Sequence, residues 1–104
     1  MDHINLKVNS KLSITINKQT FSDIVNSLNL TIENIKVNTK KTKVHIVPNS
    51  NNVIISLDLK VKQKQNLELK NIFKLIKEKV EMHCLLLIEQ KPINVLINYT
   101  GNFK

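Results

Sequence analysis

The stretch Val53–Lys62, with the sequence VIISLDLKVK, decides the fold. Neighbouring residues of a β-strand point to opposite faces of a sheet, so every second residue shares a face. One face of this stretch is mostly polar, and the other is aliphatic throughout. The aliphatic face holds Val53, Ile55, Leu57, Leu59 and Val61. This pattern predicts a strand in a sheet that packs on a core with one side and meets water with the other.

The segments just before this strand complete a hairpin. Val44 to Val47 is strand-like, and residues 48–52, PNSNN, have the composition of a turn. We therefore expect an antiparallel hairpin over residues 44–62. Further upstream, Ile35 and Val37 indicate a short strand that ends at the polar run 40–43.

Two segments have the apolar spacing of amphipathic helices. Residues 18–30 follow Asn17, a good N-cap, and carry apolar side chains three and four positions apart. Residues 66–83 show the same spacing, and two Lys–Glu pairs four residues apart can form on their solvent face. Residues 84–88, CLLLI, fit either a last helical turn or a connecting strand.

At both ends of the chain, apolar and polar residues alternate as they do in β-strands. Ile4 to Ile16 reads as one long strand or as a strand broken at Asn9 and Ser10, and residues 93–99 give the final strand, closed by Gly101. Residues 1–104 thus form a single α+β domain with the order β-α-β-β-α-β. We expect a two-layer sandwich in which a mostly antiparallel sheet carries both helices on one face.

Composition excludes several functions. Gly101 is the only glycine, so neither a dinucleotide-binding fingerprint nor a nucleoside-triphosphate loop can form. Cys84 is the only cysteine, which rules out an intrachain disulfide and favours the reducing cytoplasm. Met1–Val8 lacks the apolar core of a signal peptide, and no apolar run approaches the length of a membrane span. Membrane contact is therefore expected only peripherally or through a partner.

The formal charge is +8, with sixteen basic residues against eight acidic ones. Such an excess favours an anionic partner. However, every basic residue is lysine. Arginine is better suited to phosphate and guanine, because its planar guanidinium donates two parallel hydrogen bonds. The abundance of Lys, Asn and Ile also indicates compositional drift, so part of the charge is explained as a solvated surface. Electrostatic binding of nucleic acid or anionic lipid is kept as the alternative function.

Sheet-type RNA readers stack bases on exposed strand aromatics. Here Phe21 and Phe73 fall on the helix stripes, Tyr99 shares the parity of the core residues, and the polar face of Val53–Lys62 has no aromatic residue. Only a lysine patch supports this comparison. Its members are Lys36, Lys40, Lys41, Lys43, Lys60, Lys62 and Lys64.

The reactive side chains form no recognisable catalytic or metal-binding motif. The imidazoles are His3, His45 and His83, and the last adjoins Cys84, a spacing that does not chelate one ion on a helix. A nucleophilic Cys84 would need an orienting acid and oxyanion donors, and its apolar neighbours raise the pKa of a thiol. We expect Cys84 to be a packed structural residue, and we expect no enzyme, no cofactor and no metal.

Two surfaces remain for interaction. The mid-strand carboxylate Asp58 is expected in a cross-strand ion pair. An unpaired sheet edge can add a strand from a partner, and Leu96 is the one large apolar residue on the otherwise polar face of the last strand. The candidate interaction surface on the open sheet face comprises Ser56, Asp58, Lys60, Lys62, Asn94 and Leu96.

The stretch Ile16 to Ile35, INKQTFSDIVNSLNLTIENI, resembles the opening of the alkaline shock protein (general stress protein) family of Gram-positive bacteria. Members of that family open with an apolar residue and a capping serine, followed by a helix with paired apolar residues and then by the motif Val-x-Gly-Val. In this chain Asn34 occupies the position of the glycine in that motif. The stretch INVLI at residues 93–97 resembles the family's closing Val-Asn-Val-x-Val strand. The family's Thr-Gly after the second helix has no counterpart in residues 82–88.

The resemblance extends over roughly residues 12–99. It implies a non-enzymatic cytoplasmic protein linked to stress response and cell-envelope homeostasis. It also implies a protein partner or self-association.

Overall fold

The computed structural model describes residues 3–64 and 68–104, the side chain of Val8 excepted. The expected helix start at residue 66 lies outside these ranges. In chain order the elements are β1 (His3–Asn9), β2 (Leu12–Asn17), α1 (Lys18–Asn26), α2 (Leu28–Thr31), β3 (Ile35–Val37), β4 (Lys43–Val47), the 3-10 turn η1 (Pro48–Ser50), β5 (Asn52–Lys62), α3 (Leu69–Ile88) and β6 (Asn94–Phe103).

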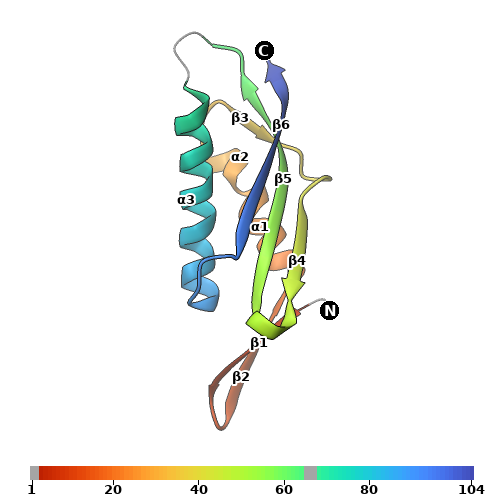
Figure 1. Ribbon diagram of the computed structural model, residues 1–104, viewed down its shortest axis with the longest axis vertical. Coiled ribbons are helices and arrows are strands. Elements are labelled where there is room, and N and C mark those ends of the chain that lie inside the picture. The colour runs from red at the N-terminus through yellow and green to blue at the C-terminus, as the bar shows by residue number, and fades with distance from the viewer. Residues whose placement is uncertain (1–2, 65–67) are drawn as a thin grey trace.

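The main sheet is built around β5, which pairs with β3, β4 and β6. β4 pairs antiparallel with the first half of β5 and β3 pairs antiparallel with its second half. β6 runs parallel to β5 along the opposite edge, in the register Ile54↔Asn94 to Lys62↔Phe103. Figure 1 shows β5 and β6 side by side along most of the sheet.

The expectation that the N-terminal strand joins this sheet is wrong. β1 and β2 form a separate two-stranded antiparallel hairpin that projects from one end of the molecule (Figure 1). Asn9 turns the chain by accepting a hydrogen bond on Oδ1 from the Lys11 N–H, at 2.8 Å. Ile4 and Ile16 pair at the hairpin base and are buried there. The alternation of residues 4–16 therefore encodes two strands and not one.

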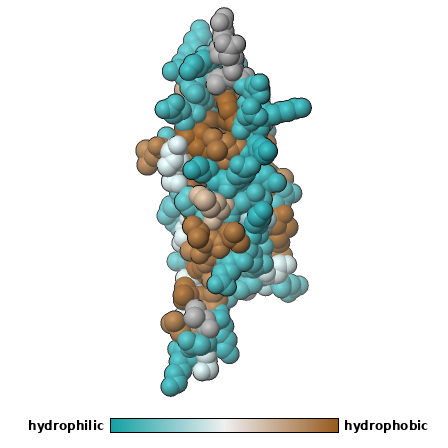
Figure 2. Space-filling view, turned by 90° about the vertical axis from the view of Figure 1, so that its left-hand side faces the viewer, coloured by the Kyte–Doolittle hydropathy of each residue, from teal (hydrophilic) through white to brown (hydrophobic). Residues whose placement is uncertain are grey.

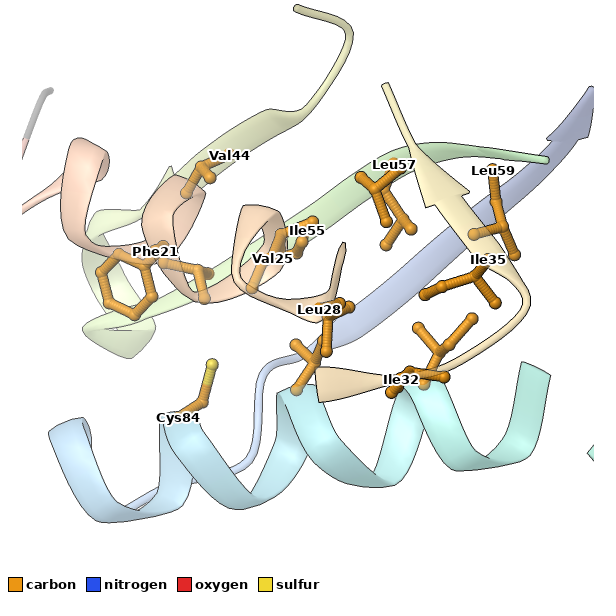
Figure 3. Packing of buried hydrophobic residues seen from close by; sticks show 14 of the residues in the cluster. Phe21, Val25, Leu28, Ile32, Ile35, Val44, Ile55, Leu57, Leu59 and Cys84 are labelled. Atoms are coloured by element: carbon orange, nitrogen blue, oxygen red, sulfur yellow. The ribbon is translucent and has the colours of Figure 1, made fainter. Parts of the chain in front are cut away.

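Both long helices pack on one face of the main sheet, as expected. Val53, Ile55, Leu57, Leu59 and Val61 are at most 1% exposed. Figure 3 shows this core between β5, the α1–α2 segment and α3. The α+β two-layer architecture predicted from the sequence is therefore confirmed.

Several local boundaries differ from the sequence-based expectation. The first helix divides at Ser27 into α1 and α2, and Asn17 occupies the N-cap without a side-chain capping bond. α3 continues through Ile88, so residues 84–88 are helical. Glu89 then ends the helix in the left-handed conformation, with φ 60° and ψ 20°.

Candidate interaction surface

The open face of the sheet brings all six residues of the candidate interaction surface onto one side. In the parallel pairing of β5 with β6, Ser56 lies beside Leu96 and Asn94 lies beside Ile54. Asp58, Lys60 and Lys62 follow Ser56 along β5 on the same face. From Ser56 to Lys62 the strand advances about 20 Å, so one contact does not span the whole surface.

Two depressions divide this face into halves. The broader one, about 770 Å³, is lined in part by Ser56 and Leu96 and extends over β4 to the start of α1. The other, about 410 Å³, lies where β3, β5 and β6 meet and includes Asp58 and Lys60. The first depression therefore combines Leu96 with Lys18 and Lys43, and the second combines lysines and Asp58 with the ring of Phe103.

Leu96 is the exposed apolar feature of the first half, with 48% of its surface accessible. It belongs to β6, which pairs with β5 alone in the part of the chain that the structure describes. The other edge of this ten-residue strand therefore presents backbone N–H and C=O groups without a strand partner. An edge of that kind is a template for strand addition.

Asp58 does not make the expected cross-strand ion pair. Its Oδ1 accepts a hydrogen bond from the Asn98 Nδ2, at 3.2 Å, and no ion pair recorded among the described residues reaches it. The neighbour directly across on β6 is Asn98, which is why an amide and not an ammonium reaches the carboxylate. The pairing of β5 with β6, unknown from the sequence, decides this partner.

Phe103 is a residue of the open face that sequence reasoning missed. The register between β5 and β6 shifts by one residue between Leu59 and Lys60, so Lys60 pairs with Gly101 and Lys62 with Phe103. Such a bulge moves all later residues to the opposite face. Phe103 consequently lines the 410 Å³ depression with Lys60. Simple alternation from Tyr99 would place Phe103 on the helix-covered face.

The bulge depends on the one glycine of the chain. Gly101 has φ 125°, a backbone conformation that L-residues with a side chain rarely adopt. On the helix side, Tyr99 packs against Phe73 of α3 with 5.8 Å between ring centroids, and its hydroxyl bonds to Asn102. The positive φ of Gly101 therefore accompanies the change of face between Tyr99 and Phe103.

Asn38 anchors one wall of the same depression. Its N–H donates to the Asp58 carbonyl at 3.0 Å, and its carbonyl accepts from the Lys41 N–H at 3.0 Å. Its side-chain Oδ1 accepts from the Lys40 N–H at 3.1 Å. The loop that carries Lys40 is thus tied to β5 and holds a defined position beside the groove.

Asn52 is a second residue whose role the sequence did not reveal, because it reads there as part of a turn. It is 6% exposed; its Nδ2 donates to the Lys91 carbonyl at 2.9 Å, and its Oδ1 accepts from the Val53 N–H at 2.7 Å. These bonds tie the start of β5 to the connection between α3 and β6. They help to fix where β6 begins on the open face.

Cys84 is buried in the core, as expected, with its sulfur directed from α3 toward α1 (Figure 3). Burial, with a smaller contribution from the Glu81 carboxylate, raises the pKa of the Cys84 thiol to about 11. A thiol held neutral in this way is a poor nucleophile. His45 and His83 are on exposed positions, and the described residues contain no group of three or more His, Cys, Asp or Glu placed to hold a metal.

A second apolar surface lies on the outer side of α3. Figure 2 faces this side of the molecule and shows hydrophobic patches separated by hydrophilic side chains. The exposed apolar residues of the helix are Leu69, Leu75, Met82, Leu85 and Leu86, with Leu86 at 78% exposure. Leu69 lies at the edge of the stripe that contacts the sheet, beside Tyr99, and the other four lie away from that stripe.

Comparison with protein-family models, with curated proteins and with solved structures gives no match. None of the helices in the described ranges combines the length and apolar character that crossing a bilayer requires.

Proposed function

We propose that this chain is a non-enzymatic interaction module, a scaffold that binds a protein partner or a second copy of itself. The observation that carries the proposal is β6, a long edge strand that pairs on one side only in the described sheet and presents the half-exposed Leu96. A partner strand at this edge gains backbone hydrogen bonds, and Leu96 supplies apolar contact area beside them.

The biological setting follows from the resemblance to alkaline shock proteins. On that basis the module acts in the cytoplasm, in stress response and cell-envelope homeostasis, and reaches the membrane only peripherally or through its partner. One backbone feature supports the resemblance. Asn34, which stands where the family has glycine, has φ 68°. It therefore keeps the left-handed conformation that glycine favours.

The direct test is Leu96→Lys, with Leu30→Lys as the matched control. Leu30 is 89% exposed on α2, so both changes place a lysine at an exposed leucine. We expect Leu96→Lys to reduce oligomer mass in light scattering, or to abolish cross-linked capture of a partner from the source cell. The Leu30→Lys chain should behave as the parent.

Two outcomes would count against the proposal. If Leu96→Lys leaves both the oligomer mass and the captured partner unchanged, the β6 edge is not the interface. If Leu86→Lys alone removes the interaction, the interface is the outer side of α3. Nuclease treatment of the lysate separates protein contacts from contacts bridged by nucleic acid.

A further inference from the structure

The positive charge of the chain is concentrated on one side of the fold. Residues 34–64 contain seven lysines and one carboxylate, Asp58, so they carry a net +6 of the chain's +8. Residues 68–89, which include all of α3, contain four lysines and four glutamates and are neutral. Compositional drift would enrich lysine on both sides alike. The excess instead belongs to β3, β4, β5 and their loops.

Within this side, three lysines converge on the 410 Å³ groove between β3, β5 and β6. Lys36 and Lys60 are direct cross-strand neighbours in the pairing of β3 with β5, and Lys40 lies on the adjoining loop. No ion pair recorded among the described residues engages any of the three. Like charges directly across a sheet repel each other, so an anion in the groove relieves that repulsion.

The groove also contains an aromatic ring. Phe103 reaches the open face through the bulge at Gly101 and lines the groove with Thr100. A flat apolar ring beside three cations is the arrangement with which sequence-tolerant proteins hold single strands, because phosphates meet lysines while a base stacks on the ring. The Asp58 carboxylate, also in the groove, is hydrogen-bonded to Asn98.

We propose that this groove binds single-stranded nucleic acid. Lys36, Lys40 and Lys60 contact successive phosphates, and Phe103 stacks on one base. The bases of a duplex are already stacked on each other and do not offer a face to the ring. A flat bilayer takes up protruding apolar side chains, whereas Phe103 lies in a concave site. This proposal is independent of the protein interface at Leu96.

The test measures the affinity of the full chain for a fluorescein-labelled oligothymidylate or oligouridylate of about twelve nucleotides. Fluorescence anisotropy is recorded from roughly 50 to 200 mM salt. The groove variant Lys36→Gln, Lys40→Gln, Lys60→Gln should bind at least about tenfold more weakly and lose about two units of the log–log salt slope. The control variant Lys70→Gln, Lys74→Gln, Lys91→Gln removes the same charge elsewhere and should stay within about twofold of the parent.

The variant Phe103→Leu separates the contribution of base stacking to the affinity from that of the lysine charges. We expect it to weaken oligonucleotide binding about tenfold and to leave the binding of inorganic polyphosphate unchanged. The Leu96→Lys variant should bind the oligonucleotide at least as tightly as the parent chain does. A loss of the protein interface at β6 can therefore be distinguished from a loss of oligonucleotide binding in the groove. Thermal unfolding of each variant shows that the fold is retained.

Three results would overturn the proposal. Equal losses in the groove and control variants would mean diffuse attraction to the whole surface. If Phe103→Leu binds the oligonucleotide with unchanged affinity, no base stacks on the Phe103 ring. Tighter binding to an acidic peptide or to phosphatidylserine vesicles than to the oligonucleotide would assign the groove to a different partner.

Discussion

The two faces of β5 have the same backbone and opposite surroundings. On the helix-covered face, every second residue from Val53 to Val61 is buried against α1, α2 and α3. On the open face, the intervening residues from Ile54 to Lys62 are partly or fully exposed. One strand therefore supplies stability with one set of side chains, and in our proposals it supplies recognition with the other. A change on one face should leave the property of the other face intact.

The largest expected difference between the two faces arises when one aliphatic side chain is truncated on each. Leu57 is 0% exposed, and Leu57→Ala should lower the free energy of unfolding by about 3 kcal/mol because it leaves a cavity. Ile54→Ala on the open face should cost about 1 kcal/mol or less. Urea denaturation measures both. Equal losses would mean that the open face is also packed, by a second copy or another part of the chain.

Alternation along β5 made the fold predictable, since it identifies the strand, the buried face and the need for helices on that face. The same alternation was ambiguous for residues 4–16, because one long strand and a tight hairpin give the same pattern of burial. The deciding feature is the turn at Asn9, which is local and weak in the sequence. The neighbour of a side chain across two paired strands, such as Asn98 for Asp58, depends on the register of the strands. The periodicity of the sequence does not reveal that register.

The composition of the candidate interaction surface was predictable in part for the same reason. Alternation placed Ser56, Lys60 and Leu96 on the open face, where the structure has them. It failed for Phe103, because a bulge inserts one residue and reverses the face of everything after it. The isolated Gly101 in a strand pattern was the available signal, since such a glycine often marks a bulge.

The connection that positions β6 offers a second test on the buried side. Asn52→Ala removes the donor to the Lys91 carbonyl and the acceptor for the Val53 N–H. Both groups then lose a buried partner, and we expect a loss of about 2 kcal/mol in the free energy of unfolding. Asn98→Ala on the exposed face of β6 is the control and should cost about 0.5 kcal/mol or less. A loss for Asn52→Ala as small as the control's would show that water replaces the amide.

The buried thiol on the helix-covered side makes the stability of the fold depend on pH. The pKa of the Cys84 thiol rises from 9.0, the value taken for the unfolded chain, to about 11 in the folded chain. Below the unfolded value both states hold the proton, so stability is constant. Above it the unfolded chain alone releases the proton, and stability falls as pH rises toward 11.

By pH 10 this linkage should remove about 1 kcal/mol of stability relative to pH 8. Cys84→Val keeps an apolar side chain of similar size and removes the titrating group. The difference in unfolding free energy between parent and Cys84→Val, followed by denaturant titration from pH 8 to 10, isolates the thiol from the lysines. A difference that does not change with pH would mean that the thiol ionises in the folded chain as readily as in the unfolded one.

The smallest expected effect concerns the residue that lets β6 change faces. A Cβ at Gly101 meets no atom within 4 Å, so Gly101→Ala creates no clash. Its cost arises from φ 125°, and we expect a loss of about 1 kcal/mol in unfolding free energy. The alanine also favours a strand without the bulge, which would return Phe103 to the helix-covered side. Gly101→Ala should therefore weaken oligonucleotide binding as Phe103→Leu does, although the three groove lysines are intact. An unchanged stability together with unchanged binding would show that the open face does not depend on this bulge.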